Sequence, residues 1–209
     1  MNKFTFDESS IDRLKRDVAS RMSEYRFNHT LGVEKMAISL GEIFMPDNIS
    51  ELRVAALLHD VSKEMDIDEQ LCLLDNCERI DKKQKCVPAA LHSFSAVAVI
   101  LRDFPNLATN NILDAVENHT LGSPNMSLFS EIIFISDYIE EGRAYFESAS
   151  VRKTLFEKIK QSKTQGDRIK ALHFATVLSI SNTLKDLQKR GLVPDERSLK
   201  TKIAFEALI

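Results

Sequence analysis

The sequence Arg53-Val-Ala-Ala-Leu-Leu-His-Asp60 is an apolar stretch that ends in two adjacent polar side chains. Burying an imidazole beside a carboxylate costs free energy unless both groups find a partner. A divalent metal ion is such a partner, because both side chains are common metal ligands. The stretch therefore predicts a core helix that brings His59 and Asp60 to a buried metal site.

Apolar residues recur at helical spacing through nearly all of the 209-residue chain, and strand-like alternation is nearly absent. We expect an all-α bundle of nine or ten helices, at about 10–23, 26–44, 50 to 59–63, a short one from 66, 88–102, 109–119, 127–139, 147–161, 166–190, and one from 195. The predicted helix starts use Ser50, Thr109, Ser127 and Asp195 as N-caps, Asp66 with Glu69 as a capping box, and Pro88 in a first turn. Residues 1–209 are expected to form one domain, with its core over 20–190 and a C-terminal extension over 191–209.

The composition excludes some classes of function. The net charge of −3 gives no overall basic field, so we expect neither nucleic-acid nor membrane binding, and no apolar run reaches the ~20 residues of a membrane span. The cysteines Cys72, Cys77 and Cys86 form no C-x-x-C pair, and residues 1–7 lack the apolar core of a signal peptide. These features predict reduced thiols and a cytoplasmic location.

Four histidines recur at nearly regular intervals along the chain. His29, His59, His92 and His119 are separated by 30, 33 and 27 residues. Since a helix and its loop take about half of such an interval, two elements separate successive histidines. Two elements return the chain to the same end of an up-and-down bundle, so the four imidazoles could converge. The fifth, His173, has no matching partner and is expected to be a hydrogen-bonded core residue.

Asp137 is a carboxylate in the nearly all-apolar helix 132–139, and it is the sixth candidate ligand. Its helix rises ~15 Å after Ser127, so Asp137 joins the others only if the helix crosses the site obliquely. Each of these groups taken singly could also be a satisfied core residue. Together, four imidazoles and two carboxylates exceed the needs of one tetrahedral zinc ion.

The ligand set suits two metal ions, with Asp60 as the natural bridge between them. Mixed nitrogen and oxygen ligands suit iron, manganese, zinc or nickel. Two such ions can polarise a phosphoryl group and generate a bridging hydroxide at neutral pH. The sequence therefore predicts hydrolysis of a phosphoester or a phosphoanhydride.

The order of these residues resembles that of the HD superfamily of metal-dependent phosphohydrolases. The more specific strings are Arg26-Phe-Asn-His-Thr-Leu-Gly-Val33, Ala55-Ala-Leu-Leu-His-Asp-Val-Ser-Lys-Glu64, Pro88-Ala-Ala-Leu-His92, His119-Thr-Leu-Gly-Ser-Pro-Asn-Met-Ser127 and Ser136-Asp-Tyr-Ile-Glu-Glu-Gly-Arg143. Over about residues 20–190 they resemble the YqeK-like symmetrical bis(5'-nucleosyl)-tetraphosphatases. The resemblance implies cleavage of diadenosine tetraphosphate into two ADP by a metal-bound hydroxide, and it makes a homodimer plausible.

The resemblance also implies roles for individual residues. The family uses a binuclear centre, usually of iron. One metal would be held by His29, His59, Asp60 and Asp137, and Asp60 would bridge to a second metal held by His92 and His119. We expect Asp60 and Lys63 to act in catalysis, and the cations Arg26, Lys63 and Arg143 to bind the polyphosphate.

The chain departs from the family pattern at Ser93, where glycine is usual, near Glu131, where lysine is usual, and near Glu141, where proline is usual. These changes leave the six candidate ligands in place and bear on contacts to the nucleotide and its phosphates. Three alternatives remain open. They are another HD phosphohydrolase acting on nucleoside monophosphates or cyclic nucleotides, a non-catalytic nucleotide-binding sensor, and a di-iron oxygenase.

Overall fold

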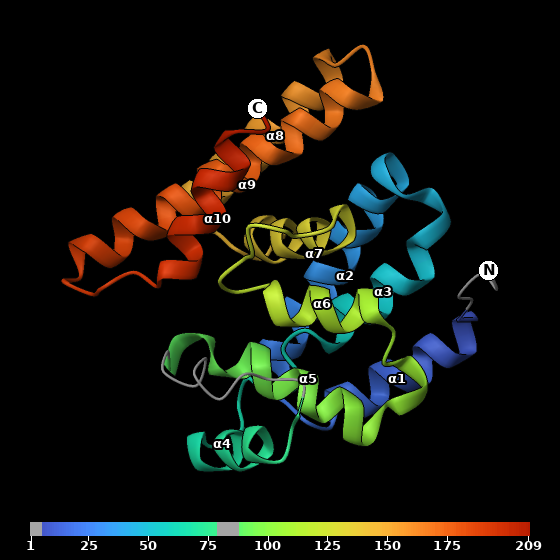
Figure 1. Cartoon of the computed structure of the whole chain (residues 1–209). Helices are drawn as coiled ribbons and strands as arrows, with labels where there is room; N and C mark the ends of the chain where they lie inside the picture. Colours follow the sequence, from blue (N-terminus) through green and yellow to red (C-terminus); the bar gives the residue numbers. More distant parts are fainter. Residues whose placement is uncertain (1–5, 79–87) are drawn as a thin grey trace.

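A computed structural model describes residues 6–78 and 88–209 of the chain. Over these residues the chain forms ten α-helices and no strand, which confirms the predicted all-α fold (Figure 1). The helices are α1 (Glu8–Ala19), α2 (Glu24–Phe44), α3 (Ile49–Leu58), α4 (Ile67–Asp75), α5 (Leu91–Asp103), α6 (Asn110–Asn118), α7 (Leu128–Ile139), α8 (Phe146–Gln161), α9 (Gln165–Lys189) and α10 (Glu196–Glu206). Short 3-10 turns lie at η1 (Pro46–Asn48), η3 (Pro88–Ala90) and η4 (Pro105–Leu107).

Three of the predicted helix starts are confirmed by side-chain caps. Thr109, Ser127 and Asp195 each accept a hydrogen bond from a backbone N–H in the first turn of α6, α7 and α10. Such caps satisfy N–H groups that have no partner within the helix. Asp7, Ser23 and Thr164 cap α1, α2 and α9 in the same way.

Three expectations about helix starts need correction. Ser50 lies inside α3, because η1 winds directly into that helix and Asn48 takes the cap position without a side-chain bond. Asp66 occupies the N-cap of α4, but its side chain makes no cap hydrogen bond, so the predicted capping box with Glu69 is absent. Pro88 begins the turn η3, which leads into α5.

Buried apolar side chains from α1 through α9 form a contiguous core, with Leu57, Phe94 and Ile132 among its fully buried members. Helix α7 packs against α2, α3 and α6 on one side and against α8 and α9 on the other. Figure 1 shows α8, α9 and α10 lying together as a layer above α7. The C-terminal helix α10 packs on α9 and buries Phe205.

A buried carboxylate ties the beginnings of α3 and α6 together. Glu51 on α3 accepts hydrogen bonds from Thr109 Oγ1 at 2.6 Å and from Asn111 Nδ2 at 3.0 Å, both at the start of α6. At the other ends of these helices, the rings of His59 and His119 lie 5.0 Å apart, centroid to centroid. The two helices therefore run side by side in the same direction, and both end at the candidate site.

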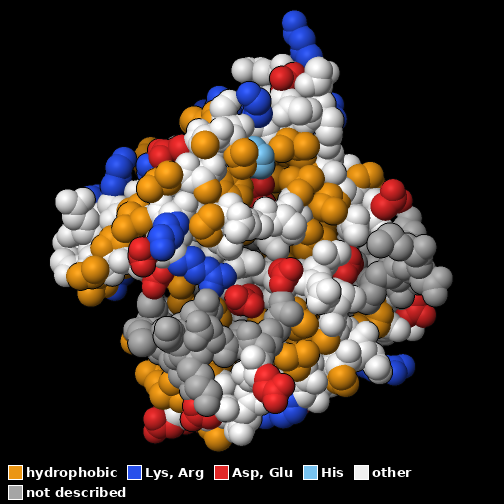
Figure 2. Space-filling model, viewed as in Figure 1, with side chains coloured by type: hydrophobic (Ala, Val, Ile, Leu, Met, Phe, Trp, Pro, Cys, Tyr) orange, Lys and Arg blue, Asp and Glu red, His pale blue; other side chains and the backbone are white. Residues whose placement is uncertain are grey.

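Charged side chains of both signs lie on the surface (Figure 2). On the face in Figure 2, acidic and basic side chains are interspersed. No described helix is long and apolar enough to cross a membrane. Cys72 and Cys77 are free thiols, exposed and half-buried respectively, while Cys86 lies outside the described residues.

Candidate metal centre

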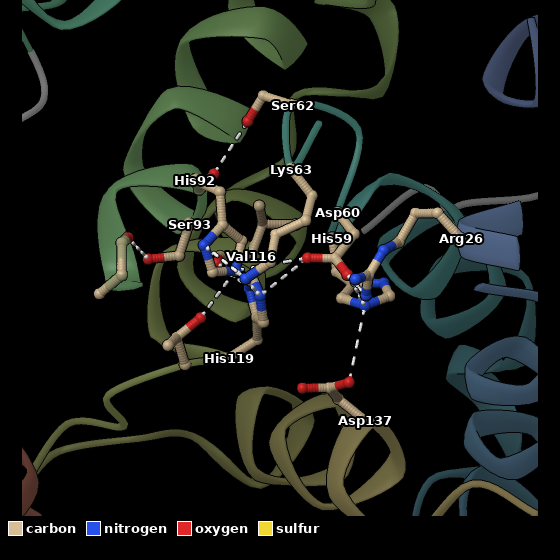
Figure 3. Close-up of polar contacts among 12 residues, drawn as sticks. Arg26, His59, Asp60, Ser62, Lys63, His92, Ser93, Val116, His119 and Asp137 are labelled. Carbon is tan, nitrogen blue, oxygen red and sulfur yellow. Dashed lines mark hydrogen bonds and ion pairs between the residues drawn. The ribbon is translucent and has the colours of Figure 1, made fainter. Parts of the chain in front are cut away.

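The structure brings all six predicted ligands to one place in the core. Figure 3 labels His59, Asp60, His92, His119 and Asp137 there. Helix ends supply most of them. His29 lies in the second turn of α2, His59 and Asp60 directly follow α3, His92 is in the first turn of α5, His119 directly follows α6, and Asp137 is near the end of α7. His59, Asp60, His92 and His119 are each at most 4% exposed, so the site is closed to bulk water on that side.

The two oxygens of Asp60 face different pairs of histidines. Oδ1 lies 3.3 Å from His92 Nε2 and 3.5 Å from His119 Nε2. Oδ2 lies 3.4 Å from His59 Nε2 and 3.8 Å from His29 Nε2. A carboxylate divided in this way has the arrangement of a bridge between two metal positions.

Asp137 lies on the same side of the site as His29 and His59. Its Oδ1 is 2.9 Å from His29 Nε2 and 3.8 Å from His59 Nε2. Helix α7 begins at the cap Ser127, far from the histidines in sequence, and it crosses the bundle so that its last turn reaches them. Helix α7 therefore crosses the site as the ligand role of Asp137 requires, which spacing in the sequence had left undecided.

His59 and His119 are held by the same local device. Each directly follows a helix, and its Nδ1 donates a hydrogen bond to the carbonyl three residues earlier, at 2.6 Å to Ala56 and 2.7 Å to Val116. Because Nδ1 donates this hydrogen bond, Nε2 of each ring faces the site, where its lone pair can bind a metal ion once the ring has lost its second proton. Figure 3 shows both rings directed toward Asp60.

Glu140 orients His29, and the sequence had not singled it out. This carboxylate is 2% exposed and its Oε1 lies 3.2 Å from His29 Nδ1, while Oε2 accepts a hydrogen bond from the Gly142 N–H at 2.5 Å. Gly32, one turn after His29, makes room for it, since a Cβ there would collide with Glu140 Oε2. The sequence signal that could have identified Glu140 is its position as a carboxylate directly after the apolar helix that carries Asp137.

The buried carboxylates stay ionised because positive groups surround them. Burial alone would raise the pKa of Asp60, but His59 and His119 hold that pKa well below its ordinary value. Burial likewise opposes ionisation of Asp137, and the Arg143 guanidinium and His29 keep its pKa well below the usual range. Burial and the neighbouring His119 lower the pKa of His92 to about 2, so this ring is neutral at pH 7 and can act as a ligand.

The three predicted phosphate-binding cations all lie at the centre. Arg26 donates to Asp60 Oδ2 at 2.9 Å, and Arg143 donates to Asp137 Oδ1 at 2.6 Å. Lys63 Nζ lies 3.0 Å and 3.1 Å from the two ring nitrogens of His92, and burial lowers its pKa. Thr120, another residue that the sequence had not indicated, places Oγ1 3.1 Å from His92 Nε2.

The departures from the family pattern lie outside the cluster of ligands. The Ser93 hydroxyl donates to the Ala90 carbonyl at 2.8 Å, within its own helix turn. Glu131 is buried between α7 and α9, where it accepts from Thr176 and lies 3.0 Å from His173 Nδ1. Glu141 is exposed and forms an ion pair with Lys35. His173 is thus a hydrogen-bonded residue between helices, away from the site.

The spacing and burial of the donor atoms fit metal ions. Two groups have ligand atoms within 4.8 Å of one another, His29–His59–Asp137 and His59–Asp60–His119, and His92 Nε2 lies 3.1 Å from His119 Nε2 beside the second group. Two of the atoms that face the centre, His59 Nε2 and Asp60 Oδ1, are buried and have no hydrogen-bond partner among the described residues. Buried polar atoms without partners are costly, and coordination would satisfy them.

Residues 26–142, more than half of the chain, match the family described as HD domain. The chain belongs to the HD domain family. The matched span contains all six residues of the centre and the cations Arg26 and Lys63, and it ends one residue before Arg143.

Known relatives of this HD domain protein agree with that assignment. A symmetrical bis(5'-nucleosyl)-tetraphosphatase of Halalkalibacterium halodurans is 30% identical over 90% of this chain and 94% of its own length. One of Bacillus subtilis is 29% identical over 83% of this chain and 86% of its own. A crystal structure from Clostridium acetobutylicum, described as a predicted HD superfamily hydrolase involved in NAD metabolism, superposes with a TM-score of 0.78 and 25% identity. The match covers 94% of this chain and 96% of that one. These relatives place the chain among the HD phosphohydrolases.

Replacing Gly32 with alanine tests the role of Glu140. The new methyl group should displace the Glu140 carboxylate from His29, and loss of such an outer partner weakens metal binding by about 10- to 100-fold. Calorimetric titration of the purified variant with Mn²⁺ measures the effect. Gly166→Ala is the matched control, because the nearest atom to a Cβ there is 3.7 Å away. Equal Mn²⁺ affinities in two folded variants would show that Glu140 does not position His29.

Proposed function

We propose that this protein hydrolyses the phosphoanhydride chain of diadenosine tetraphosphate symmetrically and releases two molecules of ADP. The proposal is supported by relatives with this name that align over most of their own length, at 30% and 29% identity. The observation that carries it is the divided carboxylate of Asp60, which faces His29 and His59 with one oxygen and His92 and His119 with the other. A homodimer and a cytoplasmic location stay predictions from the sequence.

We assign the six residues to a binuclear metal centre. His29, His59, Asp60 and Asp137 would hold one ion, and Asp60, His92 and His119 the other. Iron is the first candidate from the family resemblance, and the nitrogen and oxygen donors also suit manganese, zinc or nickel. Two ions held there would supply Lewis-acid polarisation of a phosphoryl oxygen and a water molecule of lowered pKa.

The chain's own cations would bind the polyphosphate. Arg26 and Arg143 are hydrogen-bonded to carboxylates of the centre, and Lys63 lies over His92, so all three stand at the edge of the metal positions. An incoming anion can share these donors, and charge-assisted bonds to phosphate are among the stronger hydrogen bonds in proteins. They would also stabilise the charge that builds up on the departing ADP.

The reaction products test the proposal. The purified, metal-loaded protein is expected to convert diadenosine tetraphosphate into ADP as the sole product, as measured by anion-exchange chromatography. Asp60→Ala should abolish turnover because it removes the carboxylate whose two oxygens face the two halves of the site, whereas Asp68→Ala, an exposed position on α4, should leave turnover unchanged.

Other products would support a different function. AMP plus ATP would mean asymmetric cleavage and would contradict the proposal. Turnover of nucleoside monophosphates or cyclic nucleotides alone would indicate another HD phosphohydrolase activity. Nucleotide binding with no turnover in the metal-loaded wild type would indicate a sensor, and oxygen-dependent turnover of an organic substrate would indicate an oxygenase.

A further inference from the structure

A cavity of about 670 Å³ opens directly onto the His29 side of the centre. It is lined by Tyr25, Arg26, Asn28, His29, Glu140, Gly142, Arg143, Ala144 and Tyr145. Sites for nucleotide-sized ligands commonly enclose about 300–1,000 Å³, so one nucleoside diphosphate fits this volume. The cavity is continuous with the centre, because His29 belongs to both.

Two exposed tyrosines stand in this cavity, each beside a cation of the centre. Tyr25 precedes Arg26 and lies one helical turn before His29, and it is 77% exposed. Tyr145 follows Arg143 by two residues and is 69% exposed. It occupies the N-cap position of α8 without a side-chain cap bond. In the described part of the chain neither ring packs on another aromatic ring.

We propose that Tyr25 and Tyr145 form the stacking surface for the base of one nucleotide half of the substrate. This rests on the proposed function, in which the phosphates lie at the metal centre. Arg26 and Arg143 would then hold the phosphates at the inner end of the cavity, and the base would extend outward over the neighbouring rings. A planar base has a stacking face whatever its identity, so this surface selects a nucleotide over a bare phosphate chain.

Binding of ADP and of inorganic diphosphate to the metal-loaded protein tests this surface. Tyr25→Ala and Tyr145→Ala should each weaken ADP binding by roughly tenfold and leave diphosphate binding unchanged, because only ADP carries a base. Tyr25→Phe and Tyr145→Phe should retain ADP affinity, since they keep the aromatic face. Phe146→Ala is the matched control, because this adjacent ring is 83% exposed but lines no part of the cavity.

The outcomes separate this proposal from the proposed function. Unchanged ADP affinity in the alanine variants, or equal losses for ADP and diphosphate, would overturn the stacking surface even if the wild type releases ADP from diadenosine tetraphosphate. Selective loss of ADP binding in a protein that does not cleave diadenosine tetraphosphate would support the surface and refute the proposed substrate. No preference of the wild type for ADP over diphosphate would also overturn it.

A second, independent observation concerns the C-terminal helix, which lies outside residues 26–142 of the family match. Arg197 on α10 reaches both sides of His119, with hydrogen bonds from its guanidinium to the Asn118 side chain and, at 2.7 Å from Nε, to the Gly122 carbonyl. Ser198 donates to the Leu121 carbonyl at 3.0 Å. The segment 118–122, which contains His119, is therefore bonded to α10 at three residues, Asn118, Leu121 and Gly122.

The fit between α10 and this loop is close. Gly122 has a φ of 71°, in the left-handed region, and a Cβ there would lie 2.8 Å from Thr201 Cγ2 on α10. Glycine alone adopts this conformation without strain and leaves space for the helix. We infer that Arg197 is a positioning residue, which holds the segment 118–122 so that His119 and Thr120 face His92.

Metal titration of Arg197 variants tests this role. Arg197→Met should weaken Mn²⁺ at the position that His92→Ala abolishes, by about 10- to 100-fold, and leave the other position unchanged. Arg197→Lys should restore part of the affinity, and Lys200→Ala, on the exposed face of the same helix, should have no effect. Should Arg197→Met fail to fold, Ser198→Ala applies the same test with one bond removed. Equal loss at both metal positions, or no loss at either, would show that α10 only stabilises the fold.

Discussion

The fold is arranged around one buried carboxylate that must remain charged. Asp60 is 3% exposed, and a carboxylate at that depth is costly unless positive or donor groups compensate it. Four imidazoles and the Arg26 guanidinium face its two oxygens, from α2, α5 and the residues that follow α3 and α6. Each helix that brings a side chain to Asp60 therefore begins, ends or passes beside this carboxylate. The apolar core of α1 to α9 fixes these helices and so holds the polar centre in place.

The sequence was sufficient to predict the helices and to select the six candidate ligands, but its spacing brought only the four histidines together. Helical periodicity is a strong signal in a chain with 6 glycines and 5 prolines, because few residues interrupt it. The spacing of the histidines predicted their convergence correctly. Helices α2 and α5 run away from the candidate site and α3 and α6 return to it, so histidines about two elements apart in sequence meet there. The position of Asp137 was conditional on a helix crossing, which depends on side-chain packing and is not encoded in spacing.

The groups that the sequence did not reveal all act through tertiary contacts. Glu140 is an acidic residue like its exposed neighbour Glu141 until the fold places it against His29. Arg197 lies 78 residues after His119, and only the packing of α10 brings it to that loop. The error at Ser50 has a local cause, because the turn η1 continues into α3 and shifts its start to Ile49. Local patterns thus gave the ligands, and packing supplied the groups that orient them.

The central claim is that Asp60 joins two metal positions in one buried centre. Anomalous X-ray diffraction from crystals grown with Mn²⁺ tests it most directly, because the ions are located without reference to activity. The account predicts two peaks per chain on opposite sides of the Asp60 carboxylate, one beside His29, His59 and Asp137 and the other beside His92 and His119. A single peak, or two peaks of which only one contacts Asp60, would contradict it.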